Sequence, residues 1–128
     1  MSRALNSSEM LWIEKLLTVN FKGKEILQKQ LAKTGVTVNE EFSFISLKFN
    51  VDKSIEKFPF NVRVPVEMRA FQGESAPIVF LLHVIDGFAN ELEIFPADSS
   101  KIELGLISLE KIDYDINKDR RQEPCDSF

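Results

Sequence analysis

The sequence contains 128 residues, of which 44% are hydrophobic and 28% are charged. This length fits one domain, which buries about two thirds of its unfolded surface and needs no disulfide or metal to hold its core. The single cysteine, Cys125, excludes an intrachain disulfide. The chain shows neither a secretory signal nor the ~20 apolar residues of a membrane span, so we expect a cytoplasmic protein that does not bind membranes.

The net charge of −4 is unevenly distributed along the chain. Residues 1–69 contain 11 Lys and Arg against 8 Asp and Glu (+3), whereas residues 70–128 contain 5 against 12 (−7). A half this acidic repels nucleic acid and attracts basic partners. A solvated acidic surface without a partner is the simpler alternative.

Two helices are predicted near the N-terminus. Asn6 and Glu9 have the spacing of a capping box, and helical periodicity then continues to about Val19. A second helix is predicted after Gly23, with Gly35 as its C-terminal cap. The expected buried residues are Met10, Leu11, Ile13, Leu16 and Leu17 in the first helix, and Ile26, Leu27, Gln30 and Leu31 in the second.

From Val36 the hydrophobic period changes to two, which predicts strands. We expect one strand up to residue 51, and a second over residues 62–71, where Pro65 indicates a sheet edge or a bulge. Residues 77–95 predict a central hairpin. Its two strands, 78–85 and 88–95, meet in a turn at Asp86-Gly87, and a short fifth strand is expected over residues 112–116.

Helices followed by strands predict an α+β fold, with two N-terminal helices packed on one face of a four- to five-stranded, mainly antiparallel sheet. We assign residues 1–116 to this single domain. Residues 117–128 have no apolar period and are expected to form a mobile tail.

Few residues suit catalysis or metal binding. His83 is the only histidine and Cys125 the only cysteine, so the usual zinc ligand sets are absent. Glu91 and Glu93 share one strand face and suit acid–base work or a divalent cation, but an outward polar face explains them more simply. We therefore expect no enzyme, no catalytic residue, no cofactor and no metal. An enzyme that uses His83 with Glu91 or Glu93 is the alternative.

The sheet face without helices is the predicted interaction surface. Its strand positions combine hydrophobic side chains, such as Val79, Ile85 and Phe44, with a ring of charges, as protein-binding surfaces do. The partner-binding residues that we predict are Arg63, Glu67, Arg69, Leu81, His83, Glu91, Glu93 and Phe95. The alternatives are that a second copy of the chain or its own tail covers this face, or that it is solvated.

Three segments, Phe21–Leu31, Arg63–Glu67 and Leu81–Ile94, resemble a widespread family of small uncharacterised bacterial proteins. The shared patterns read FxGxExLxxQL and LLHVxDGxxxELEI, and the resemblance spans roughly residues 10–95. Some members are thought to be immunity proteins encoded beside polymorphic toxins. The resemblance thus implies a non-enzymatic module that neutralises a toxin domain, and our charge argument favours a basic one. A homo-oligomeric structural or assembly protein, such as a homodimer, is the alternative.

Overall fold

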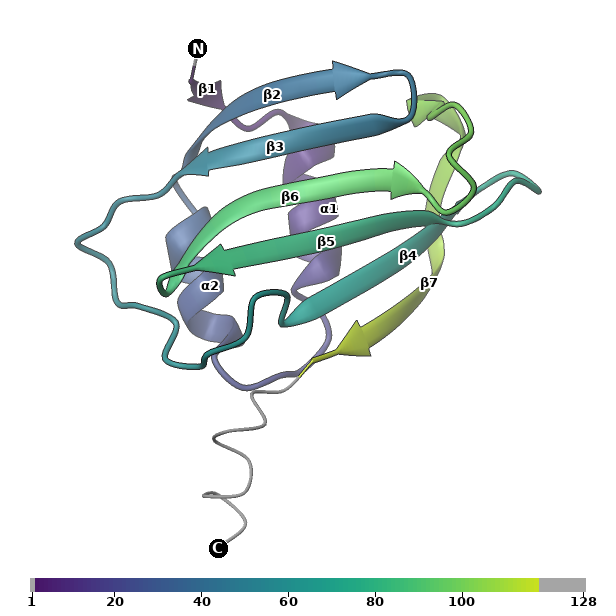
Figure 1. Ribbon diagram of the computed structural model, residues 1–128. Helices are drawn as coiled ribbons and strands as arrows, with labels where there is room; N and C mark the ends of the chain where they lie inside the picture. Colours follow the sequence, from purple (N-terminus) through teal and green to yellow (C-terminus); the bar gives the residue numbers. More distant parts are fainter. Residues whose placement is uncertain (1, 118–128) are drawn as a thin grey trace, which may run out of the picture.

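The computed structural model describes residues 2–117, which form a seven-stranded sheet and two helices (Figure 1). The helices are α1 (Ser7–Leu16) and α2 (Lys24–Leu31), and η1 (Leu104–Leu106) is a 3-10 turn. The strands are β1 (Arg3–Ala4), β2 (Gly35–Glu41), β3 (Phe44–Asn50), β4 (Val66–Gln72), β5 (Ile78–Ile85), β6 (Phe88–Pro96) and β7 (Ile107–Ile116). All pairings are antiparallel, in the order β1-β2-β3-β6-β5-β4-β7. The α+β class is confirmed, but the predicted count of four to five strands was wrong.

The additional strands have local causes. The single strand predicted from Val36 is a hairpin, because Phe42 and Ser43 form a two-residue turn between Glu41 and Phe44. Phe42 is not a turn-forming residue and neither turn position has a positive φ, so the sequence carries no clear turn signal there. The two-residue strand β1 is too short for a pattern. β7 begins at Ile107, before the predicted start at residue 112. The prediction missed this part because the alternation of β7 is interrupted where its register with β4 shifts.

Pro65 lies just before β4 rather than within an edge strand. β5 and β7 flank β4 on both sides, so the predicted edge position was wrong. Because β4 begins at Val66, the missing N–H of proline falls outside the ladder. The carbonyl oxygen of Pro65 instead accepts a hydrogen bond of 3.0 Å from the backbone N–H of Asn117.

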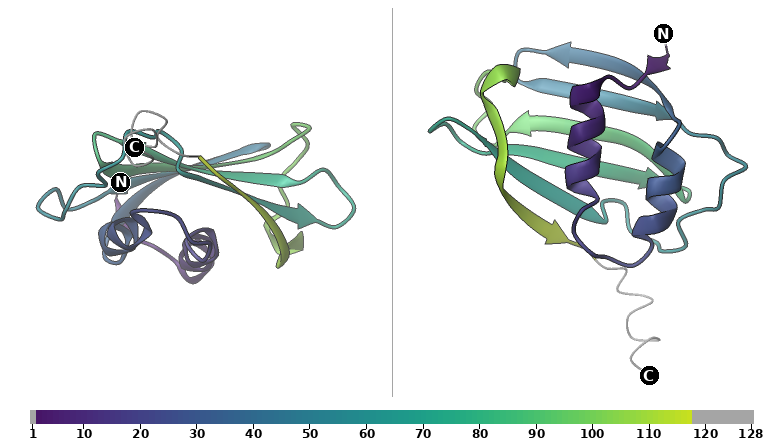
Figure 2. Two further views of the ribbon diagram at one scale, coloured as in Figure 1. Left: turned by 90° about the horizontal axis from the view of Figure 1, so that it is seen from below. Right: turned by 180° about the vertical axis from the view of Figure 1, so that it is seen from behind.

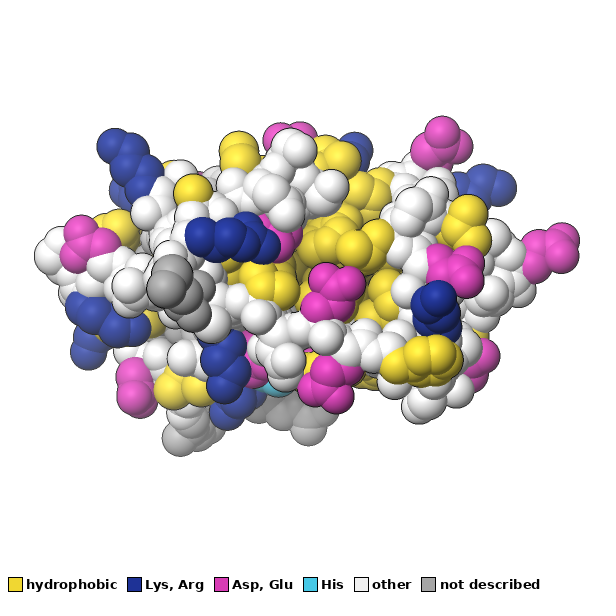
Figure 3. All heavy atoms as spheres, turned by 90° about the horizontal axis from the view of Figure 1, so that it is seen from above, with side chains coloured by type: hydrophobic (Ala, Val, Ile, Leu, Met, Phe, Trp, Pro, Cys, Tyr) yellow, Lys and Arg dark blue, Asp and Glu magenta, His cyan; other side chains and the backbone are white. Residues whose placement is uncertain are grey.

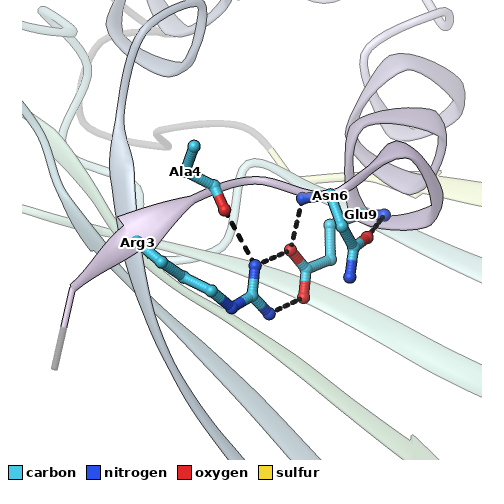
Figure 4. Close-up of polar contacts among 4 residues, drawn as sticks. All are labelled: Arg3, Ala4, Asn6 and Glu9. Atoms are coloured by element: carbon cyan, nitrogen blue, oxygen red, sulfur yellow. Dashed lines mark hydrogen bonds and ion pairs between the residues drawn. The ribbon is translucent and has the colours of Figure 1, made fainter.

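Both helices lie on the same side of the sheet (Figure 2). The predicted capping box starts α1: Glu9 N donates to Asn6 Oδ1 (2.8 Å), and Asn6 N donates to Glu9 Oε1 (2.9 Å). Arg3 adds two hydrogen bonds, of 2.9 and 2.7 Å, to the same carboxylate (Figure 4). The buried Glu9 therefore joins β1 to the first turn of α1.

The buried side of α1 differs from the prediction. Ile13, Leu16 and Leu17 are buried as predicted, and so is Trp12, which was not predicted, whereas Met10 and Leu11 are 56% and 43% exposed. The side chain of Glu9, which pairs with Arg3, is buried as well. The inward face of α1 therefore includes Glu9 and excludes Met10 and Leu11. The helix ends at Leu16, before the predicted Val19. The predicted buried residues of α2 lie in or against the core.

The central hairpin forms as predicted. Asp86 (φ 53°) and Gly87 (φ 85°) make a two-residue turn of the type that matches strand twist. The fully buried Gln30 of α2 makes two hydrogen bonds to this end of the hairpin: Nε2 donates to the carbonyl of Gly87 (2.9 Å), and Oε1 accepts from Ala89 N (2.8 Å). A third hydrogen bond runs from Nε2 to the carbonyl of Glu56 (3.0 Å) in the loop after β3. α2 therefore fixes the end of the hairpin to the core.

The predicted C-terminal cap of α2 was wrong. The helix ends at Leu31 with Ala32 as its cap, in a right-handed helical conformation. Gly35 is the first residue of β2 and pairs with Ala4. A β-carbon at this glycine would meet Ser2 Oγ, the end of an exposed side chain that can turn aside, and would make ordinary contact with the carbonyl of Arg3 (3.6 Å).

Candidate protein-interaction face

The sheet face opposite the helices, here called the open face, carries the predicted partner-binding residues. The register places Leu81 of β5 between Glu93 of β6 and Glu67 of β4. Its other predicted members on the sheet are Arg69, His83, Glu91 and Phe95, while Arg63 lies in the loop before β4. None of residues 2–117 forms a second layer over this face (Figures 1 and 2).

His83 connects two charged side chains across the open face. Arg63 Nε donates to His83 Nδ1 (3.2 Å), and His83 Nε2 lies 2.9 Å from Glu93 Oε1. A guanidinium group has only donors, so this arrangement requires a lone pair on Nδ1 and a proton on Nε2. His83 thus orients Arg63 and Glu93 side by side on the surface.

A second network lies toward the β7 edge. Arg69 Nη1 donates to Glu67 Oε2 (2.7 Å) and to Asp115 Oδ2 (2.8 Å). The hydrogen bond to Asp115 is the main reason that the pKa of Arg69 is raised above its ordinary value. Asp115 was not predicted as part of this face, because only the β4–β7 register brings it beside Arg69.

Glu91 is held by a residue that the sequence analysis overlooked. Ser46 Oγ of β3 donates to Glu91 Oε2 (2.5 Å), and Ser46 is buried. β3 also contains Lys48 and Asn50, so the serine in it was not a distinctive signal for this contact. Glu91 and Glu93 therefore each have a separate partner, in Ser46 and His83, and do not form an isolated carboxylate pair.

The hydrophobic side chains of the open face differ in how far they are exposed. Leu81 and Phe95 are half-buried, Val79 is buried with 9% exposed, and Ile85 at the end of β5 is 37% exposed. The face combines a half-exposed apolar centre with oriented charged groups. This combination suits a protein partner, which buries the apolar centre and pairs with the charges at the rim.

The structure offers little support for metal or acid–base chemistry. Among residues 2–117, no group of three or more His, Cys, Asp and Glu side chains is placed to hold a metal ion. A surface hollow of about 360 Å³ beside Arg63 and Ile85 is not lined by His83 or by either strand glutamate. Cys125 and the predicted tail after Asn117 lie outside the described residues.

The helix side carries a separate groove of about 480 Å³ between α1 and α2. Met10, Ile13 and Leu17 line it from α1, and Leu31 from α2. None of the eight predicted partner-binding residues borders this groove.

Comparison with known proteins gives no relative from which a function could be transferred. No family model, curated protein or solved structure matches the chain. The resemblance to the bacterial family therefore stays a prediction. No helix within residues 2–117 is long and apolar enough to cross a membrane.

Proposed function

We propose that the chain is a non-enzymatic protein-binding module, of the immunity type, that neutralises a bacterial toxin domain with its open face. The observation that supports binding is the partly exposed centre of Leu81 and Phe95, bordered by charged side chains that their own partners hold in position. Side chains ordered before binding lose less entropy when a partner arrives.

The charge of the open face favours a basic partner. Its acidic residues are Glu41, Glu67, Glu91, Glu93, Asp113 and Asp115, and its basic residues are Lys48, Arg63 and Arg69. Six carboxylates against three cations give a net charge of −3. An acidic surface accelerates association with a basic protein, and this effect weakens as salt is added. The immunity role itself is supported only by the family resemblance.

Co-purification with the protein encoded by the neighbouring gene tests this proposal. We expect a complex at micromolar concentration in low salt, which Leu81→Glu weakens at least tenfold because it places a charge at the apolar centre. Gln28→Glu is the matched control, since Gln28 is exposed on α2, on the other side of the sheet. Absence of any complex in low salt would overturn the immunity role.

A second copy of the chain is the alternative partner for the open face. The partial exposure of Ile85 and Leu81 favours it, whereas the net negative charge opposes two such faces in contact. Sedimentation of the pure protein separates the two functions. A stable dimer that dissociates in the Leu81→Glu variant would support a homo-oligomeric structural role instead of an immunity role.

A further inference from the structure

His83 is the only histidine of the chain, and its two ring nitrogens contact groups of opposite charge. Arg63 Nε donates to Nδ1 (3.2 Å), while Nε2 lies 2.9 Å from Glu93 Oε1. The arginine belongs to the loop before β4 and the glutamate to β6, so the imidazole of β5 joins neighbouring parts of the open face. The side chain of His83 is only 15% exposed, which limits its contact with water.

The two contacts of the imidazole respond differently to a second proton. A neutral ring has one N–H and one lone pair, and the hydrogen bond from Arg63 assigns the lone pair to Nδ1. A second proton can therefore bind only at Nδ1, where it would face the N–H of a guanidinium group that has no acceptor. The hydrogen bond would be replaced by two donors and two positive charges in contact. The Nε2–H group donates to Glu93 in both states, and this contact becomes an ion pair when the ring is charged.

The side chain of Arg63 can leave the imidazole while the backbone of its loop stays in place. The carbonyl of Arg63 accepts a hydrogen bond of 2.7 Å from Val84 N of β5. The carbonyls of Val64 and Pro65 accept from the side chain (2.7 Å) and the backbone N–H (3.0 Å) of Asn117. Because the side chain of Arg63 is exposed, its guanidinium can exchange the imidazole for water.

Other charged groups surround His83 on the open face. They are Arg63 from the loop before β4, Glu67 from β4, Glu91 and Glu93 from β6, and Lys48, which pairs with Glu91 from β3. Figure 3 looks onto the β1–β2 edge of the sheet and shows a small part of the histidine, in cyan, among side chains of both charges. Glu93 can compensate the charge of an imidazolium at Nε2, whereas Arg63 is the group that a proton on Nδ1 displaces.

We propose that His83 is a pH-sensitive switch of the open face, which holds Arg63 while the ring is neutral and releases it when Nδ1 takes up a proton. Histidine is the side chain whose charge ordinarily changes between about pH 5 and 8. After protonation the guanidinium of Arg63 turns to solvent and Glu93 stays bound to the ring. The switch changes which charged groups the open face presents in fixed positions, as histidine protonation does in other pH-sensitive interfaces.

The consequence for binding rests on the function proposed above. A proton on His83 changes the net charge of the open face from −3 to −2 and frees a cation on it. A basic partner should therefore be attracted less strongly in mild acid.

Nuclear magnetic resonance of the isolated chain, labelled with ¹⁵N and ¹³C and free of a histidine tag, tests the switch without a partner. Every imidazole signal then belongs to His83. At about pH 8 the ring-nitrogen resonances should show a proton on Nε2 and none on Nδ1, and at about pH 5.5 they should show a proton on both. The Nε–Cζ group of Arg63 should be ordered at the higher pH. At the lower pH its order parameter should fall below about 0.6, the range of flexible groups.

Arg69 is the internal control, because its partners Glu67 and Asp115 are not histidines, and it should stay ordered at both pH values. His83→Gln is the matched variant. Glutamine keeps an acceptor for Arg63 but takes up no proton in this range, so the order of Arg63 should not change with pH. The backbone amide spectrum verifies that each sample is folded.

Four results would each overturn the proposal. They are a proton on Nδ1 at about pH 8, a ring that stays neutral at about pH 5.5, equal order of Arg63 at both pH values, and the same change of Arg63 in His83→Gln. Failure of the open-face function would leave these measurements unaffected, because no partner is present in them.

Discussion

Gln30 provides a sharp test of how α2 holds the central hairpin. The Gln30→Leu variant keeps the size of the side chain and removes all three of its hydrogen bonds. Gly87 O still accepts from Phe58 N (2.8 Å), and Glu56 is exposed, so water can reach its carbonyl. Ala89 N is buried and loses its partner.

One buried unsatisfied donor costs about 1–3 kcal/mol, and the two weakened acceptors add to this, so we expect a loss of about 2–4 kcal/mol in the free energy of unfolding. Urea denaturation followed by the fluorescence of Trp12 measures the loss, because this single tryptophan is buried 5.9 Å from the ring of Phe80. Gln28→Leu, an exposed change on the same helix, should shift stability by less than about 0.5 kcal/mol. Equal effects of the two variants would refute the assigned role of Gln30.

Three further variants test other parts of the fold. Arg3 and the N–H of Asn6 hold the pKa of Glu9 below its ordinary value, against the opposing effect of burial. The stability that the ionised Glu9 contributes is therefore present above pH 4.5 and is lost as the pH falls through the lowered pKa. When the free energy of unfolding is followed during acid titration, the Glu9→Gln variant should lose less stability than the unmodified protein. Gly87→Ala should cost more than Gly73→Ala, by about 1–2 kcal/mol in urea denaturation, because both have positive φ but only the β-carbon at residue 87 would meet Lys57 (2.8 Å). Burial raises the pKa of Tyr114, the only tyrosine, so its ultraviolet absorbance should titrate above pH 10 in the folded protein and near pH 10 in urea. Tyr114→Phe should lower the free energy of unfolding by about 1 kcal/mol, because it removes the hydrogen bond to the carbonyl of Lys15.

Local signals in the sequence were sufficient for the elements whose causes are local. The capping box of Asn6 and Glu9 and the turn at Asp86-Gly87 each depend on residues within a few positions of each other. The β2–β3 turn was missed because Phe42 occupies a position where turn-forming residues are usual. Non-local contacts such as the bond from Gln30 to Gly87, 57 residues away, leave no pattern in the sequence.

The same distinction applies to the open face. Strand alternation was enough to place Leu81, Glu91 and Glu93 outward. The pairing of Ser46 with Glu91 and of Asp115 with Arg69 depends on which strands are neighbours, and strand order was not predictable from the alternation.

The central claim is that a protein partner binds the open face. The most direct measurement is an amide chemical-shift titration of the isotopically labelled chain with the protein encoded by the neighbouring gene. We predict that the largest shifts fall on β5 and β6, around Leu81, His83 and Glu93, and that Leu81→Glu, which weakens the complex at least tenfold, strongly reduces them. Shifts confined to α1 and α2, or no shifts at micromolar concentrations of both proteins in low salt, would contradict the claim.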